Sequence, residues 1–246
     1  MDNQLLSEQE LERYSRHLIL PGFGRKGQEK LKAAKVLVIG AGGLGSAVLK
    51  YIAAAGTGHI GIIDNDTVSV NNLQRQVLYD TRDVGYKKTD IAKKKLSSLN
   101  PHVNFTIYDS QLTRENSDDI IKNYDLVIDC SDNYETRYTS NDSVLRLDKP
   151  LVFGSVKNYE GQLSVFNYHK GPNYRDLYPD PPDESNTPES DLGIMGVLPG
   201  IIGCLQVNEA IKIITGTGEI LSGKLVVINL LTNSFTTLQI SKTGKN

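Results

Sequence analysis

The chain contains little cysteine, with only Cys130 and Cys204 among its 246 residues. Two cysteines are too few for a four-cysteine zinc site, and both lie in apolar stretches, LVIDCSD and IIGCLQV. Free cysteine in such surroundings is usually a small buried hydrophobic residue. We therefore expect both thiols to be buried and to have no catalytic role. The scarcity of cysteine also fits a reducing compartment.

The sequence lacks a strong excess of charge, a long apolar run and an apolar leader. Its formal net charge is −2, so nucleic-acid binding has no electrostatic support. No apolar run approaches the roughly 20 residues that a membrane-spanning helix needs. The polar start MDNQLLSEQELERYSR lacks the apolar core of a signal peptide. These absences predict a cytoplasmic globular protein that binds neither nucleic acid nor membrane.

Short apolar runs alternate with helical segments through residues 35–156. The runs predict strands at 35–39, 59–66, 103–107, 125–130 and 150–156, and the segments between them predict helices at 46–55, 87–99, 116–123 and 134–147. Such alternation is typical of an α/β fold with a doubly wound, mostly parallel sheet of the Rossmann type.

The two ends of the chain do not continue this alternation of strands and helices. Helices are predicted at 4–20, capped by Ser7, and at 26–33. Alternating runs at 161–168 and 224–240 predict antiparallel strands, and a loop rich in Pro and acidic residues fills 178–191. A buried helix is expected at 197–216. No linker is long enough to divide the chain into two domains.

A glycine-rich segment joins the first predicted strand to the first helix of the alternating region. Its glycines are Gly40, Gly42, Gly43 and Gly45, and Asp64 follows 19 residues after the last of them. Glycines at this place let backbone N–H groups approach a phosphate at a helix N-terminus, and an acidic residue at this distance binds a ribose hydroxyl. The pattern predicts a nucleotide site, which an NAD-dependent dehydrogenase would share.

Polar residues after Asp64 distinguish a triphosphate site from the site of an NAD-dependent dehydrogenase. Asn72, Arg75 and Lys88 lie close in sequence to the predicted nucleotide site. Fixed cations beside a nucleotide suit a triphosphate, and hydride transfer does not use them. The alternative for Arg75 and Lys88 is an ordinary solvated helix face.

The combination of motifs resembles the MoeB/ThiF/HesA family of ubiquitin-like-protein activating enzymes. It comprises GAGGLG, NDTVSVNNLQRQ and DCSDNYETRY, and the resemblance extends from ERYSRHLILPGFG to VLPGIIGCLQVNEAIKIITG. It implies that ATP and Mg²⁺ are used to adenylate the C-terminal carboxylate of a small ubiquitin-like protein ending in Gly-Gly. A MoaD- or ThiS-like sulfur carrier of molybdenum-cofactor or thiamine biosynthesis is the first expectation. The single domain 1–246 would comprise N-terminal helices 4–33, a nucleotide-binding half 34–156 and a partner-binding half 157–246.

The resemblance also implies residue roles. The loop of Gly43 would pack against the phosphates, Asp64 would bind the ribose, and Asn72 would contact phosphate. The residues implied in catalysis are Arg75 and Lys88 on the phosphates, Asp132 on Mg²⁺, and Arg16, which would reach the γ-phosphate of the neighbouring subunit in a homodimer.

The sequence departs from this family at its cysteines. Many bacterial members hold zinc on two Cys-x-x-Cys pairs, where this chain has Asn173 and Asp176 at the first pair and no cysteine in SFTTLQISKTGKN. We therefore expect no zinc. The loop Thr187–Asp191 has no thiol either, and the sequence ends at Asn246 without an appended sulfurtransferase domain. These features predict an enzyme that adenylates and forms no covalent bond to its partner.

Three other functions stay open at this point. The first is adenylation of another small protein or peptide, in peptide modification or tRNA thiolation. The second is an NAD-binding oxidoreductase, which the Asn72, Arg75, Lys88 and Asp132 set argues against. The third is a non-catalytic scaffold, which the intact polar positions argue against.

Overall fold

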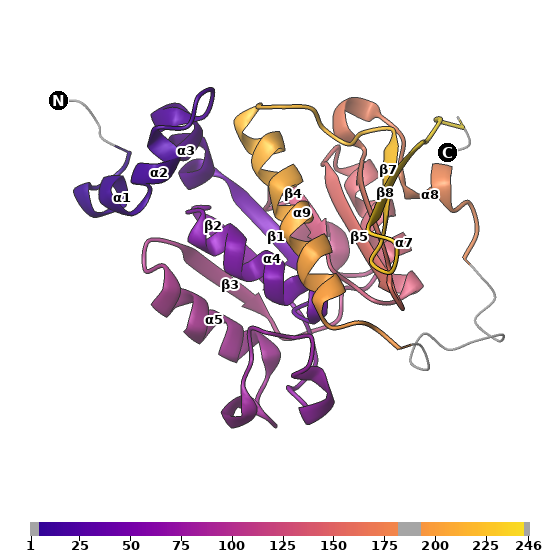
Figure 1. Cartoon of the computed structure of the whole chain (residues 1–246), viewed down its shortest axis with the longest axis horizontal. Helices are drawn as coiled ribbons and strands as arrows, with labels where there is room; N and C mark the ends of the chain where they lie inside the picture. Colours follow the sequence, from indigo (N-terminus) through magenta and orange to yellow (C-terminus); the bar gives the residue numbers. More distant parts are fainter. Residues whose placement is uncertain (1–4, 182–192, 244–246) are drawn as a thin grey trace.

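The computed structural model describes residues 5–181 and 193–243. Its centre is one eight-stranded sheet in the order β3-β2-β1-β4-β5-β6-β7-β8 (Figure 1). The strands are β1 (Lys35–Ile39), β2 (His59–Ile63), β3 (Asn104–Tyr108), β4 (Leu126–Asp129), β5 (Leu151–Lys157), β6 (Glu160–Phe166), β7 (Lys224–Asn229) and β8 (Ser234–Gln239).

The first five strands run parallel and the last three extend the sheet by antiparallel pairing. β1 pairs with β2 on one side and with β4 on the other, with Val36 opposite Ile60 and Leu126. From β5 to β8 each strand pairs antiparallel with the next. This arrangement confirms the predicted fold class. It also places a reversal of strand order between β1 and β4, where ligands of such sheets bind.

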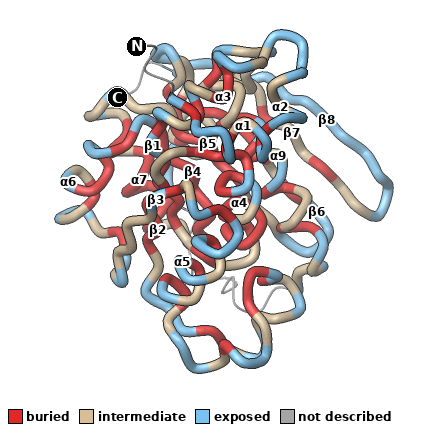
Figure 2. Tube along the Cα trace, turned by 90° about the vertical axis from the view of Figure 1, so that its left-hand side faces the viewer, coloured by how far each residue is buried: buried red, intermediate tan, exposed pale blue. Residues whose placement is uncertain are grey.

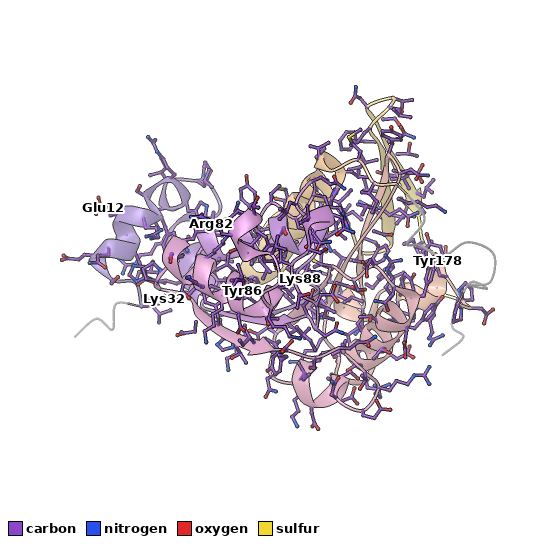
Figure 3. The ribbon with its side chains drawn as sticks, turned by 90° about the horizontal axis from the view of Figure 1, so that it is seen from below. Glu12, Lys32, Arg82, Tyr86, Lys88 and Tyr178 are labelled. Atoms are coloured by element: carbon purple, nitrogen blue, oxygen red, sulfur yellow. The ribbon has the colours of Figure 1, made fainter. Side chains whose placement is uncertain are left out.

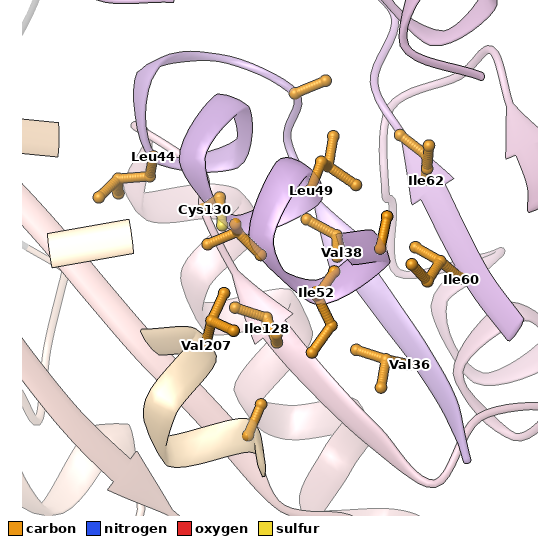
Figure 4. Packing of buried hydrophobic residues seen from close by; sticks show 14 of the residues in the cluster. Val36, Val38, Leu44, Leu49, Ile52, Ile60, Ile62, Ile128, Cys130 and Val207 are labelled. Carbon is orange, nitrogen blue, oxygen red and sulfur yellow. The ribbon is translucent and has the colours of Figure 1, made fainter. Parts of the chain in front are cut away.

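Helices cover both faces of the sheet and form two apolar clusters. Leu44 of α4 (Gly43–Ala54), Leu96 of α5 (Lys88–Leu99) and Ile202 of α9 (Val197–Thr215) belong to one cluster. Figure 4 shows part of this cluster, with Leu44 of α4 and Val207 of α9. Ile120 of α6 (Ser117–Ile121) and Tyr138 of α7 (Tyr134–Arg146) belong to the cluster on the other face, together with α8 (Tyr174–Leu177). Burial on both faces explains why the central strands read as continuous apolar runs.

The N-terminal segment corrects one prediction. The expected helix 4–20 is broken at Tyr14 into α1 (Glu8–Arg13) and α2 (Ser15–Leu18), followed by α3 (Gly24–Ala33). Ser7 and Glu10 form the expected capping box. The Tyr14 side chain is buried and its hydroxyl accepts a hydrogen bond from Asn100 at 2.8 Å. This tertiary contact fixes the direction of the chain where helical periodicity alone predicted continuation.

Helix α9 confirms its predicted ends and corrects the prediction for Cys204. Pro199 lies in its first turn, and Gly216 ends it with a φ of 73°. Cys204, expected to be buried, is exposed, whereas Cys130 is buried. Among the described residues α9 is the one helix long and apolar enough to cross a membrane, and it packs on α4, β5 and β6.

The C-terminal hairpin ends the sheet with a solvent-exposed strand. All six residues of β8 are exposed, in contrast to the buried central strands (Figure 2). Four of its six residues are polar, and the apolar Phe235 and Leu238 are exposed as well. The predicted loop 178–191 lies mostly outside the described residues, since 182–192 are not placed.

Candidate nucleotide-binding site

The carboxyl ends of β1, β2 and β4 meet at one edge of the sheet. The Gly40 amide donates to the Ile63 carbonyl at 2.8 Å, and the Cys130 amide donates to the Ile39 carbonyl at 2.8 Å. The glycine loop after β1 therefore lies between the segments that follow β2 and β4. This is the crevice at the reversal of strand order, which doubly wound sheets use for ligands.

Close backbone approach explains two of the loop glycines. A Cβ on Gly45 would lie 2.1 Å from the Gly40 carbonyl oxygen, and one on Gly40 would lie 2.8 Å from that of Cys130. Gly40 also has a φ of 89°, which disfavours any side chain. Helix α4 starts at Gly43, so its free N–H groups face the crevice end of the loop. Such a helix start suits a phosphate.

Ala41 of the loop is held from two sides. Asp64 Oδ2 accepts from its N–H at 2.7 Å, and the Tyr79 hydroxyl donates to its carbonyl at 2.9 Å. Tyr79 is buried, and this burial raises its pKa well above the usual range. Sequence reasoning identified Asp64 and missed Tyr79, because no local pattern shows which side chain reaches the loop from 38 residues away.

The segment after Asp64 brings Arg75 to the glycine loop. A short 3-10 helix, Val70–Asn72, is closed by the Asn72 side chain, whose Oδ1 accepts from the Ser69 amide at 3.2 Å. The Arg75 Cγ would lie 3.6 Å from a Cβ on Gly43, and its Nη1 donates to the Asn71 carbonyl at 2.9 Å. Arg75 therefore borders the glycine loop. The Asn72 side chain, predicted to contact phosphate, instead caps the 3-10 helix in this structure.

Lys88 is the first residue of α5, and Figure 3 shows it near the middle of the molecule. It is only 4% exposed. Its Nζ donates to Asp66 Oδ2 at 2.7 Å, and its amide donates to the Asp66 carbonyl at 3.1 Å. The sequence prediction did not include Asp66. This carboxylate is mostly exposed and lies two residues after Asp64, which binds the Ala41 amide of the glycine loop.

The loop after β4 presents Asp132 to solvent. It is shaped by the buried Asp129, which accepts from the Ser131 amide at 2.9 Å and from the Ser140 hydroxyl at 3.0 Å. No group of three or more His, Cys, Asp or Glu able to hold a metal exists within 5–181 and 193–243. A single exposed carboxylate still fits Mg²⁺, which is often bound through one carboxylate with substrate phosphates and water.

Arg16 lies away from these residues. It is exposed on α2. Its neighbour Tyr14 packs against Gly56, and the Lys32 carbonyl abuts Gly58, so the N-terminal helices contact the segment that enters β2. That segment belongs to the amino edge of the sheet, opposite the glycine loop. Figure 3 likewise shows Glu12 and Lys32 at one end of the molecule, well removed from Lys88. The structure therefore does not bring Arg16 to the site of its own chain.

Asn173 and Asp176, which stand at the expected positions of the first Cys-x-x-Cys pair, belong to one hydrogen-bonded cluster. Asp176 Oδ2 accepts from the Asn173 amide at 2.9 Å and from its Nδ2 at 2.8 Å. Asp176 Oδ1 accepts from the amide and the hydroxyl of Thr243, both at 2.7 Å. Both carboxylate oxygens thus bind protein donors: Oδ2 caps the start of α8, and Oδ1 joins α8 to the C-terminal segment through Thr243.

The fold and the crevice define a protein of the doubly wound α/β class, with a glycine loop and a helix start that suit a phosphate. The family profile described as the ThiF family matches residues 14–246. This chain belongs to the ThiF family, and the resemblance noted in its motifs is confirmed.

Curated relatives match nearly the whole chain. It is 46% identical over 242 residues to the "Sulfur carrier protein adenylyltransferase" of Thermus thermophilus, covering 96% of this chain and 89% of that protein. It is 47% identical over 239 residues to the "Probable molybdopterin-synthase adenylyltransferase" of Porphyra purpurea, covering 96% of this chain and 63% of that protein. The chain thus spans less than two thirds of the length of the Porphyra relative, and 55% of the "Adenylyltransferase and sulfurtransferase MOCS3" of Drosophila grimshawi at 44% identity.

Solved structures with lower identity share the fold. E. coli MccB crystallised with ATP superposes with a TM-score of 0.85 at 22% identity, over 100% of this chain and 75% of MccB. The structure titled SeMet PaaA gives a TM-score of 0.81 at 22% identity, over 98% of this chain and 78% of PaaA. These likenesses support the sheet and helix arrangement described above.

Proposed function

We propose that this protein uses ATP and Mg²⁺ to adenylate the C-terminal carboxylate of a small ubiquitin-like sulfur-carrier protein. The observation that carries the proposal is the convergence at one sheet edge of the glycine loop, Asp64, Arg75 and Lys88, beside the loop of Asp132. The names of the relatives from Thermus and Porphyra support adenylyl transfer and a sulfur-carrier or molybdopterin-synthase partner.

The proposed reaction joins two anions. A carboxylate oxygen of the partner attacks the α-phosphorus of ATP, the bond to the β-phosphate oxygen breaks, and acyl adenylate and pyrophosphate result. No proton transfer is needed at the reacting carboxylate, so catalysis depends on positioning and on offsetting negative charge. Arg75 beside the loop and the buried Lys88 supply fixed positive charge. Asp132 would hold Mg²⁺, which supplies further charge on the phosphates when bound.

We also propose that the functional unit is a homodimer in which Arg16 completes the neighbour's site. Arg16 lies at the opposite edge of the sheet from its own glycine loop, so an intramolecular role at the phosphates would need a different fold. Exposed apolar residues flank both halves of such a composite site: Ile19 and Leu20 follow α2, and Val70 and Val77 flank the Arg75 segment. Exposed apolar side chains at these places suit a two-fold interface.

The experiment that tests the activity is ATP–pyrophosphate exchange with small carrier proteins ending in Gly-Gly. Exchange is expected with the free terminal carboxylate and should vanish when the terminal glycine is removed or amidated. Incorporation of label in the absence of any carrier, or no exchange with any Gly-Gly protein, contradicts the proposal. A parallel titration with NAD tests the oxidoreductase alternative, for which binding of NAD and not of ATP is the expected result.

A second candidate substrate is a short peptide. MccB, whose fold this chain shares, was crystallised with MccA. Including a peptide carboxylate in the exchange assay separates the two substrate classes, because a carrier protein offers a folded surface in addition to its tail. Equal exchange with an unstructured Gly-Gly peptide and with a folded carrier favours the peptide alternative.

A further inference from the structure

A series of side-chain contacts anchors the short helix that carries Arg16. Helix α2 has four residues, which is too short to be stable by itself, and none of them is buried. The ring Nδ1 of His17 lies 2.9 Å from Gln28 Oε1. Because the Gln28 Nε2 donates to the Ala55 carbonyl at 2.8 Å, the carboxamide oxygen faces the ring, and the ring N–H is the donor. Gln28 is fully buried in α3, and both ends of its carboxamide are engaged.

Aromatic contacts hold the His17 ring at this place. The ring stacks on Tyr14 with centroids 6.3 Å apart, and it meets the Phe23 ring in a T-shaped contact at 5.2 Å. The Tyr14 hydroxyl accepts from the Nδ2 of Asn100, which also donates to the Ala53 carbonyl at 2.7 Å. The hydrogen bond and the two ring contacts therefore fix the direction of His17, and with it the direction of α2.

These contacts converge on the C-terminal end of α4. Ala53 and Ala55 lie at this end, where the carbonyls of a helix lack a full set of partners within it. The side chains of Asn100 and Gln28 supply donors to them. Helix α4 begins at the glycine loop. One helix therefore faces the proposed phosphate site at its start and anchors the segment of Arg16 at its end.

We infer that His17 and Gln28 are positioning residues, which hold Arg16 in the direction it needs to reach the phosphates of the neighbouring subunit. This inference rests on the proposed role of Arg16 in a composite site. Placement matters because a displacement of about 1 Å in a catalytic group can cost about a hundredfold in rate. An apolar residue at position 17 would leave the Gln28 oxygen without its donor and release α2. The resulting defect belongs to the neighbour's site and not to the site of the altered chain.

The first test measures ATP–pyrophosphate exchange and thermal unfolding of two variants at position 17. His17→Leu should lower kcat about tenfold or more, because Arg16 stays in the chain but loses its support. His17→Gln offers an amide donor to the same oxygen and should recover most of the lost kcat. Full kcat in His17→Leu, or no recovery in His17→Gln, overturns the inference.

Glu10→Gln is the matched control for stability. Glu10 is buried in α1, accepts from the Ser7 amide at 2.9 Å and pairs with Lys32. Its replacement weakens the N-terminal segment without touching the support of α2, so the unfolding temperature should fall while kcat stays at the wild-type value. An equal loss of kcat in Glu10→Gln and His17→Leu would mean that any loosening of this segment suffices, and would overturn the inference.

The second test identifies the site in which the defect acts. His17→Leu is mixed with Lys88→Ala or with Arg16→Ala under conditions that exchange subunits. With Lys88→Ala, the His17→Leu chain keeps its own Lys88 and receives a well-placed Arg16, so exchange should return. With Arg16→Ala, each site either lacks Arg16 or receives it from the His17→Leu chain, so exchange should not rise above that of the unmixed variants. The reverse pattern places the defect in the site of the altered chain and overturns the inference.

The outcomes also separate this inference from the proposed function. If the wild type catalyses no exchange with any carrier, the proposed function fails, and the inference fails with it. If the wild type and Arg16→Ala are equally active, the composite site and the inference both fail. If Arg16→Ala is inactive while His17→Leu keeps the wild-type kcat, only the inference fails.

Discussion

At the residue scale, three aspartates near the carboxyl edge of the sheet have different surroundings and therefore different uses. Asp64 accepts from the Ala41 amide and is half-buried. Asp129 is buried and accepts from Ser131 and Ser140. Asp132 is exposed, and no hydrogen bond or ion pair engages its side chain within the described ranges. Only Asp132 thus offers both oxygens to a cation.

This contrast predicts opposite effects for two conservative variants. Asp129→Asn should lower the free energy of unfolding by about 1–3 kcal/mol, since one amide cannot accept all the bonds that the carboxylate accepts. Asp132→Asn should leave that free energy within about 0.5 kcal/mol of wild type, as for other exposed sites, and should abolish Mg²⁺-dependent exchange. Urea unfolding and exchange assays on both variants check this. A stable but inactive Asp129→Asn protein contradicts the assignment of the two residues.

Tyr79 is predicted to act by holding the glycine loop. Tyr79→Phe keeps the ring and removes the hydroxyl that donates to the Ala41 carbonyl. The free energy of unfolding should fall by about 1–2 kcal/mol because a buried carbonyl loses its partner. Denaturant unfolding measures this, with Tyr51→Phe on the exposed surface of α4 as the control. Equal free energies of unfolding for Tyr79→Phe and Tyr51→Phe would show that the hydrogen bond from Tyr79 to Ala41 contributes nothing to stability.

At the scale of elements, the turn from β1 into α4 is limited by the contact between Gly45 and Gly40. In Gly45→Ala, the added methyl carbon would lie only 2.1 Å from the carbonyl oxygen of Gly40. The loop must move, which should cost about 1–3 kcal/mol, the range for overpacked sites. Gly200→Ala in α9, where nothing lies within 4 Å of the added Cβ, should instead stabilise the protein by about 0.5–1 kcal/mol. Thermal unfolding distinguishes the two. A destabilised Gly200→Ala variant, or a Gly45→Ala variant as stable as wild type, contradicts this explanation.

Most elements were predictable because each carries its own periodic pattern. β1, β2 and β4 read as short β-branched runs, and α9 reads as an apolar helix between Pro199 and Gly216. The break at Tyr14 was not predictable, because it depends on a bond to Asn100 across 86 residues. Boundaries depend on local signals, whereas a break of this kind depends on a tertiary contact.

The candidate site was predictable in part for the same reason. Gly40, Asp64 and Arg75 lie in local motifs, and the structure brings them to one crevice. The partners that fix them, Tyr79 and Asp66, carry no motif and are defined only by the fold. The roles of the predicted residues in catalysis, and the absence of zinc, stay predictions.

At the scale of the whole molecule, the sheet separates Arg16 from the other proposed catalytic residues. The N-terminal helices pack at the amino edge through Tyr14 and Asn100, and the glycine loop occupies the carboxyl edge. In one chain, the proposed phosphate site and Arg16 therefore lie at opposite edges of the sheet. Two chains related by a two-fold axis form two complete sites if each α2 reaches the crevice of its neighbour.

This arrangement predicts complementation between two inactive variants. Arg16→Ala and Lys88→Ala should each lack exchange activity as homodimers, while both remain folded. Mixed under conditions that exchange subunits, half of the dimers contain one of each variant. In these the Arg16→Ala chain keeps its Lys88 and receives Arg16 from its neighbour, so one of the two sites is complete. Activity per chain should return to about a quarter of wild type, as two-fold symmetry dictates.

The control for this experiment is the Arg16→Ala, Lys88→Ala double variant mixed with a wild-type chain. Its heterodimers contain the wild-type Lys88 site without the neighbour's Arg16, so that site should be silent, and activity should come only from wild-type homodimers. Recovery in the first mixture and none beyond wild-type homodimers in the second requires that Arg16 act across the interface. Activity in Arg16→Ala homodimers, or no recovery on mixing, would mean that each chain carries a complete site or that Arg16 takes no part in it.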